Sequence, residues 1–73
     1  MENFKRRNKM PVKILYKNYK GTVKTMNIEP LRMWHGSTQY YPEKQWLLDI
    51  QDIDRGVQRT LAMKSIRVWD YTL

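Results

Sequence analysis

The sequence predicts an all-β fold, a small barrel of about five antiparallel strands. From Pro11 onward, short runs rich in Val, Ile, Tyr and Trp are separated by Gly or Pro roughly every eight to twelve residues, which is typical of small β proteins. Within these runs apolar and polar residues alternate, as they do in a strand with one buried face. A chain of 73 residues has room for one domain and a small core.

The first two strands are predicted at residues 12–17 and 22–28, joined by a tight turn that ends at Gly21. The first strand has an apolar face and a basic face, formed by Val12, Ile14 and Tyr16 and by Lys13 and Lys17, respectively. Pro30 cannot donate a hydrogen bond to a neighbouring strand. We therefore expect the second strand to end or kink there.

Three more strands are predicted in the second half of the chain. Residues 45–52 alternate, with Trp46, Leu48 and Ile50 expected inward, and a turn over residues 52–56 leads to a strand at residues 57–63. A bend at residues 64–65 precedes a closing strand at residues 66–71. The longest connection carries Gln39, Tyr40 and Tyr41. The whole pattern favours an SH3-like barrel, whose closure would hide strand edges.

The charge of the chain is strongly basic and lies in its first third. There are 14 Lys and Arg against 7 Asp and Glu, a net charge of +7, and residues 1–24 account for all of it. Residues 1–10 show no strand or helix period and are predicted as a flexible basic tail before a folded domain at residues 11–73. The charge indicates a polyanionic partner, nucleic acid first and an anionic membrane or acidic protein second. The alternative is that it serves solubility alone.

Several classes of function lack the residues they need. With no Cys and one His, the chain has no disulfide framework, thiolate site or His-rich zinc site. Asp49, Asp52 and Asp54 form the one acidic cluster, but two of them fall in a predicted turn, where Asp is common. The three Gly are isolated, so there is no phosphate-binding loop. We expect no catalysis, no metal and no cofactor.

No signal peptide or apolar span is evident, so a cytoplasmic location without membrane contact is expected.

Aromatic and basic residues interleave along the second half of the chain, as in proteins that stack bases and neutralise phosphates. Trp46 alternates with strand residues and is expected mainly in the core. Tyr40 and Tyr41 are neighbours in a connection, so at least one should point outward. Arg59 falls in phase with the apolar face of its strand, where a charge must be paired or open into a pocket. Its expected partner is a carboxylate such as Asp49 or Glu29.

The order of these segments resembles the WYL domain. The carriers of the resemblance are the first strand with Tyr16, the turn at Gly21, the pair Glu29-Pro30, the segment Trp46-Leu47-Leu48 and residues 59–66. Residues 40–48, followed by residues 52–54, look closer still to small standalone WYL-like proteins of bacteriophages and prophages. Departures are Leu47 for the family Tyr, Leu61 for its Phe, and residues 63–65 for its Leu-Asp-Arg. The resemblance covers about residues 11 to 68.

The resemblance implies an SH3-like barrel that binds single-stranded nucleic acid or a nucleotide-like ligand. It assigns Tyr16, Trp46 and Arg59 to the positions of the family's first-strand Tyr, motif Trp and closing-strand Arg, respectively. We therefore expect a non-enzymatic module that binds single-stranded DNA or RNA. The alternative is a phage-encoded protein-interaction module that docks on a host protein, with the aromatic connection as its hot spot. The candidate ligand-binding residues are Lys13, Tyr16, Lys17, Arg32, Tyr40, Tyr41, Arg59 and Arg67.

Overall fold

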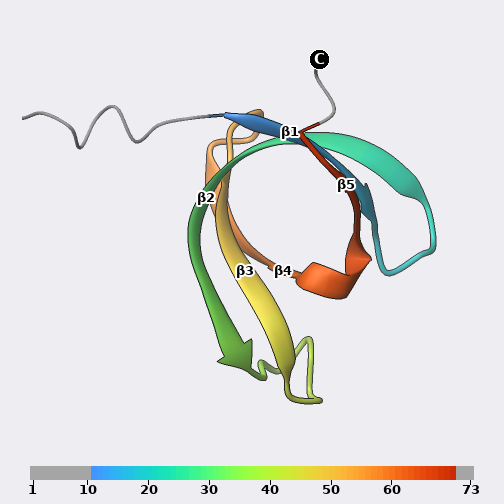
Figure 1. Cartoon of the computed structure of the whole chain (residues 1–73), viewed down its shortest axis with the longest axis vertical. Coiled ribbons are helices and arrows are strands. Elements are labelled where there is room, and N and C mark those ends of the chain that lie inside the picture. The colour runs from blue at the N-terminus through green and yellow to red at the C-terminus, as the bar shows by residue number, and fades with distance from the viewer. Residues whose placement is uncertain (1–10, 71–73) are drawn as a thin grey trace, which may run out of the picture.

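The computed structural model describes residues 11–70, which form one antiparallel sheet of five strands (Figure 1). The strands are β1 (Val12–Lys17), β2 (Val23–Gly36), β3 (Gln45–Asp52), β4 (Val57–Ala62) and β5 (Ile66–Trp69), with the 3-10 helix η2 (Met63–Ser65) between the last two. Their order in the sheet is β4-β3-β2-β1-β5. The predicted all-β class and five antiparallel strands are confirmed. The predicted tail, residues 1–10, and Tyr71 lie outside the described residues.

Two predicted turns form where Gly supplies a positive φ. Gly21, at φ 85°, lies just before β2, and its N–H donates to the carbonyl of Asn18 at 2.9 Å. Gly56, at φ 70°, precedes β4, and its N–H donates to the carbonyl of Asp52 at 2.7 Å. Residues with a Cβ rarely adopt this region. These turns set the registers of the hairpins β1–β2 and β3–β4.

The prediction that Pro30 ends the second strand is wrong, because β2 continues to Gly36. The first half of β2 pairs with β1 as far as Ile28, and the second half pairs with β3 from Ile28 onward. The register with β3 shifts between Pro30 and Arg32, so Leu31 is an extra residue there. Pro30 lies beyond the last pair with β1 and has one neighbouring strand among those described. Its missing N–H is therefore tolerated, as at a sheet edge.

The sheet curves strongly, and Figure 1 shows it bending round so that β4 and β5 face each other, with η2 between them. The strand pairings of residues 11–70 do not join β4 to β5, so both are edges of the sheet. Within residues 11–70 the predicted barrel is therefore not closed by strand pairing. No helix within residues 11–70 has the length and apolarity needed to cross a membrane.

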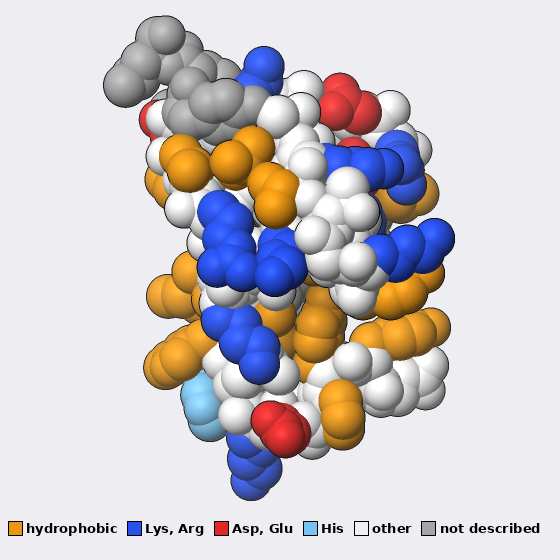
Figure 2. Space-filling model, turned by 90° about the vertical axis from the view of Figure 1, so that its right-hand side faces the viewer, with side chains coloured by type: hydrophobic (Ala, Val, Ile, Leu, Met, Phe, Trp, Pro, Cys, Tyr) orange, Lys and Arg blue, Asp and Glu red, His pale blue; other side chains and the backbone are white. Residues whose placement is uncertain are grey.

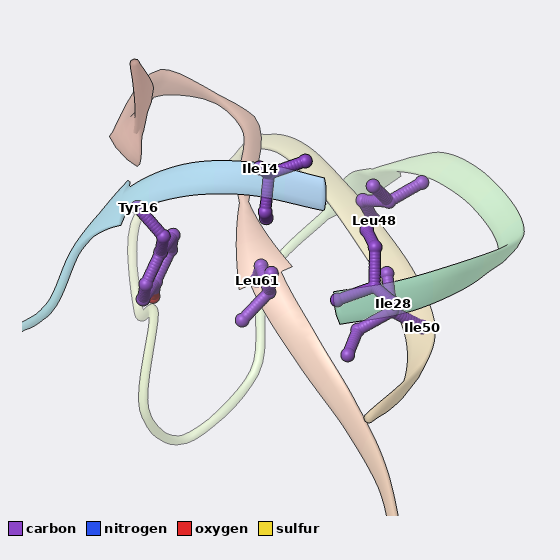
Figure 3. Packing of buried hydrophobic residues seen from close by; sticks show 6 residues of the cluster. All are labelled: Ile14, Tyr16, Ile28, Leu48, Ile50 and Leu61. Carbon is purple, nitrogen blue, oxygen red and sulfur yellow. The ribbon is translucent and has the colours of Figure 1, made fainter. Parts of the chain in front are cut away.

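The core lies inside this curve and is built from alternate residues of four strands (Figure 3). Its members are Ile14, Tyr16, Ile28, Leu48, Ile50 and Leu61. Five of the six are aliphatic and Tyr16 is the exception, so its hydroxyl must be satisfied at the rim of the core. The alternation predicted for β1 and for Leu48 and Ile50 is confirmed.

Trp46 is not in the core, which corrects the prediction. It is 54% exposed, whereas its neighbour Leu47 is fully buried. The last pair between β3 and β4 is Leu47 with Ala62, so Trp46 lies one residue beyond the cover of β4. Its ring instead meets the ring of His35 edge to face at 5.1 Å, near the end of the β2–β3 hairpin. Position along the strand, and not alternation, determines its exposure.

The burial difference between these neighbours gives a stability prediction. Leu47→Ala should lower the free energy of unfolding by about 2 to 5 kcal/mol, because it removes a buried side chain and leaves a cavity. Trp46→Ala should lower it by less than about 1 kcal/mol, because its indole is largely solvated already. Urea unfolding monitored by circular dichroism measures both. Equal losses would contradict the burial of Leu47 and the exposure of Trp46.

Candidate ligand site between the aromatic connection and β4

A pocket of about 920 Å³ lies where the first turn, the β2–β3 connection and the β3–β4 hairpin meet. Its lining residues are Tyr19, Thr38, Tyr40, Tyr41, Asp49, Gln58, Arg59 and Thr60. Three Tyr rings come from the two connections, and the polar and charged groups come from β3 and β4. Segments far apart in the sequence thus place aromatic rings opposite hydrogen-bonding side chains. Such a mixture is typical of small-ligand sites.

A compact turn holds the aromatic connection against the core. Thr38 and Tyr41 exchange backbone hydrogen bonds of 2.9 and 3.1 Å, and the Thr38 hydroxyl accepts the N–H groups of Tyr40 and Tyr41. The hydroxyl of Tyr41 lies 3.2 Å from the hydroxyl of Tyr16. Tyr41 is therefore half-buried, while Tyr40 points into solvent at 80% exposure. The expectation that these neighbours differ is confirmed.

Tyr16 does not line the pocket, but its hydroxyl contacts the hydroxyl of Tyr41, which does. It is 5% exposed, and the burial of its ring raises the pKa of its hydroxyl well above the usual value. The hydrogen bond with Tyr41 raises the pKa further, while the positive charge of Arg59 opposes the rise. Tyr16 is a neutral phenol at physiological pH. Its role is to anchor Tyr41.

Arg59 is paired with a carboxylate and is also accessible at the pocket. Both of the outcomes considered for its position in the strand are therefore observed. Its Nη1 lies 3.5 Å from Oδ2 of Asp52, and its side chain is 37% exposed at the pocket. Asp52 is 2% exposed and also accepts the backbone N–H of Arg55 at 3.2 Å. The partners suggested by the sequence, Asp49 and Glu29, were wrong. Asp52 shares the inner face of β3 with Ile50, the cross-strand neighbour of Arg59.

Asp49 is held on the opposite face of β3 by three donors. Its Oδ1 accepts Trp34 Nε1 at 3.1 Å and the Thr60 hydroxyl at 2.8 Å, and its Oδ2 lies 3.4 Å from Arg32. Burial alone would raise the pKa of Asp49, but these hydrogen bonds and the charge of Arg32 outweigh it and lower the pKa below its usual value. Asp49 is thus a charged acceptor at the pocket wall.

Four of the predicted site residues do not line the pocket. Lys13 and Lys17 are on β1, Arg67 is on β5, and Arg32 is on β2, where its guanidinium lies 5.2 Å from the Trp34 ring. Figure 2 shows a row of Lys and Arg side chains on the side of the molecule that carries β1, β5 and the first hairpin. Residues 11–70 carry ten basic and six acidic side chains, a net charge of +4. The candidate set therefore divides into a pocket group and a surface basic group.

The residues that sequence reasoning missed as pocket residues are Tyr19, Thr38, Asp49, Gln58 and Thr60. Tyr19 is 93% exposed, but a single exposed aromatic residue in a turn is common and does not by itself indicate a site. Gln58 and Thr60 flank Arg59 in β4 and are ordinary strand residues by pattern. No group of three or more metal-ligating side chains occurs within residues 11–70.

Comparison with known proteins gives no relative: no family model, no curated protein and no solved structure matches the chain.

The buried ion pair predicts a stability loss for Arg59→Ala. The change leaves the Asp52 carboxylate without its cationic partner, so the free energy of unfolding should fall by about 2 kcal/mol, below the value for a fully buried pair because Arg59 is partly solvated. Urea unfolding of Arg59→Ala and of the double variant Arg59→Ala, Asp52→Asn measures it. The double variant should recover part of the loss. A single variant as stable as the wild type would show that the pair is unimportant.

The lowered pKa of Asp49 predicts a pH dependence. A carboxyl whose pKa is lower in the folded than in the unfolded chain adds stability above the unfolded value and loses that contribution as the pH falls through the folded value. The stability advantage of the wild type over Asp49→Asn should therefore shrink below about pH 4. Urea unfolding of both proteins at about pH 6 and about pH 2 tests this. An advantage that stays constant would exclude the charge of Asp49 as its source.

Proposed function

We propose that this chain is a non-enzymatic binding module that holds single-stranded nucleic acid, or a nucleotide-like ligand, in the pocket between the aromatic connection and β4. The observation that carries the proposal is the placement of three Tyr rings beside a partly exposed Arg59. Aromatic rings stack on bases of any sequence, and a guanidinium pairs with phosphate. A pocket with both groups can bind a base and its phosphate together.

The accessible rings give the stacking surface. Tyr40 and Tyr19 are 80% and 93% exposed, so their faces are available to a base without rearrangement of the core. Tyr41 is fixed by its contact with Tyr16 and offers a rigid wall. Base stacking on an aromatic ring contributes about 1 to 3 kcal/mol for each base. Two occupied rings would give a weak but measurable affinity even before any phosphate contact.

The basic residues outside the pocket give the electrostatic component of this proposal. Lys17 ends β1, immediately before the turn that carries Tyr19, and Lys20 lies 5.8 Å from the Tyr19 ring centroid. A single strand that leaves the pocket past Tyr19 would meet these cations. Further Lys and Arg side chains lie on the face shown in Figure 2. This arrangement favours a chain of several nucleotides over a single free nucleotide.

Membership of the WYL family is part of the same proposal. Two residues carried over from the resemblance, Tyr16 and Arg59, lie at the pocket or directly beneath it. Trp46, the family's motif Trp, is exposed and away from the pocket, so it has no part in the proposed site. A cytoplasmic setting in bacteria or in phage-infected cells belongs to this proposal as well.

A second candidate function is a protein-interaction module that docks on a host protein. The observation that favours it is the exposure of Tyr19 and Tyr40, since aromatic side chains with accessible faces are the usual anchors of protein interfaces. Salt separates the candidates. Affinity for a single strand should fall with salt at a log-log slope near −0.7 for each phosphate contact.

The nucleic-acid proposal predicts that Tyr40→Ala lowers the affinity for a labelled oligothymidylate by about tenfold, equivalent to one lost stack. Trp46→Ala is the control, because it removes an exposed aromatic ring that lies outside the pocket. Fluorescence anisotropy at about 50 mM salt measures both. The proposal fails if the wild type does not bind under these conditions, or if the two variants lose affinity equally.

The charge of residues 1–10 gives a separate prediction. Lys5, Arg6, Arg7 and Lys9 lie outside the described residues, and their positive charges should add to the attraction of a polyanion. Deletion of residues 1–9 should weaken binding of all oligonucleotides to the same degree and reduce the salt slope, with the melting temperature nearly unchanged. Anisotropy titrations at several salt concentrations measure the slope. A loss limited to one base sequence would contradict this role.

A further inference from the structure

The two edges of the sheet differ in how well they could accept another strand. β5 has four residues, and its pairing with β1 shifts register between Leu15 and Tyr16. Short and irregular edge strands resist the addition of a new strand. β4 has six residues and pairs with β3 in one unbroken register. Neither strand contains Pro or Lys, and each has one Arg, so length and regular pairing are what distinguish β4 from β5. β4 is the more open of the two edges.

The pocket runs along this edge. Gln58, Arg59 and Thr60 are consecutive in β4, and all three line the pocket. Neighbouring residues in a strand point to opposite faces of the sheet. Three consecutive residues can therefore line the same pocket only if the pocket extends along the unpaired edge of the strand. The backbone N–H and C=O groups that β4 does not share with β3 therefore face the pocket. Tyr19 and Tyr40 line the same pocket.

The charges at this edge select the chemistry of its partner. Between residues 55 and 65 the chain carries Arg55, Arg59 and Lys64 and no acidic side chain. Nearby, Asp49 and Asp52 on β3 are paired with Arg32 and Arg59. Asp54, in the β3–β4 turn, accepts the side-chain amide of Asn27. Arg55 and Lys64 are therefore the cations near this edge that no described carboxylate balances. A second copy of the chain would bring its own net charge of +7 and be repelled. An acidic partner is attracted.

We propose that β4 is a docking edge for an extended acidic peptide, which adds to the sheet as a sixth strand. Its backbone would bond to the free side of β4, and its alternate side chains would lie beside the rings of Tyr19 and Tyr40. This goes beyond the oligonucleotide site, because strand addition requires the backbone of β4 and no base stacking. A peptide and an oligonucleotide would occupy the same pocket and compete for it.

The first test is a nuclear magnetic resonance titration of the isotope-labelled full chain with an acetylated decapeptide of alternating Glu and Thr. The control peptide has Lys in place of Glu. The amide signals of β4 should shift, alternate amides of β4 should gain protection from hydrogen exchange, and the Lys peptide should bind at least tenfold more weakly. Shifts centred on β5 or β2, or none at millimolar peptide, would overturn the proposal. So would pairing of β4 with a second copy when no peptide is present.

A pair of proline variants tests the backbone directly. In an antiparallel strand the N–H groups of neighbouring residues point alternately to the paired side and to the free side. Of Val57→Pro and Gln58→Pro, one should therefore remove a bond to β3 and lower the melting temperature, and the other should remove only a free donor. The variant that keeps its melting temperature should bind the Glu peptide at least fivefold more weakly. Unchanged affinity in that variant would exclude strand addition to β4. Neither result depends on whether an oligonucleotide binds.

Discussion

The contact between the hydroxyl groups of Tyr16 and Tyr41 determines the position of the longest connection in the described chain. Tyr16 is fixed in the core, so its hydroxyl is a stationary point at the core's rim (Figure 3). Tyr41 reaches it from the connection between β2 and β3. Without this contact, the turn of Thr38 to Tyr41 would keep its internal hydrogen bonds but lose its place beside β4. The position of Tyr41 in the pocket, and with it the proposed stacking site, depends on this contact.

The electrostatics of the site follow from its two carboxylates. Asp52 is buried and requires a cation, so it holds Arg59 at the inner face of β4. Asp49 is on the outer face and is supplied with donors by Trp34, Thr60 and Arg32. The negative charges that would repel a phosphate or an acidic peptide are therefore largely balanced within the sheet. Arg59 still presents more than a third of its side chain at the pocket.

Local pattern was sufficient for the strands, the turns and most of the core. Alternation predicted Ile14, Tyr16, Leu48 and Ile50, and glycine chemistry predicted the turns at Gly21 and Gly56. Local pattern failed for residues whose environment depends on which strand lies beside them. Pro30 is tolerated because β1 no longer flanks β2 there, and Trp46 is exposed because β4 has already ended. The partner of Arg59 was also missed, because it depends on the register between β3 and β4.

The measurement that tests the binding account most directly is a titration of the full chain with a short oligothymidylate, followed through the ring protons of the Tyr residues and the guanidinium of Arg59. Stacking moves ring signals strongly, and these groups can be observed one by one. The account predicts that the largest changes occur at Tyr19, Tyr40, Tyr41 and Arg59, with little change at the ring of Trp46. Binding accompanied by changes confined to residues 1–10, with the Tyr rings unaffected, would contradict a site in the pocket.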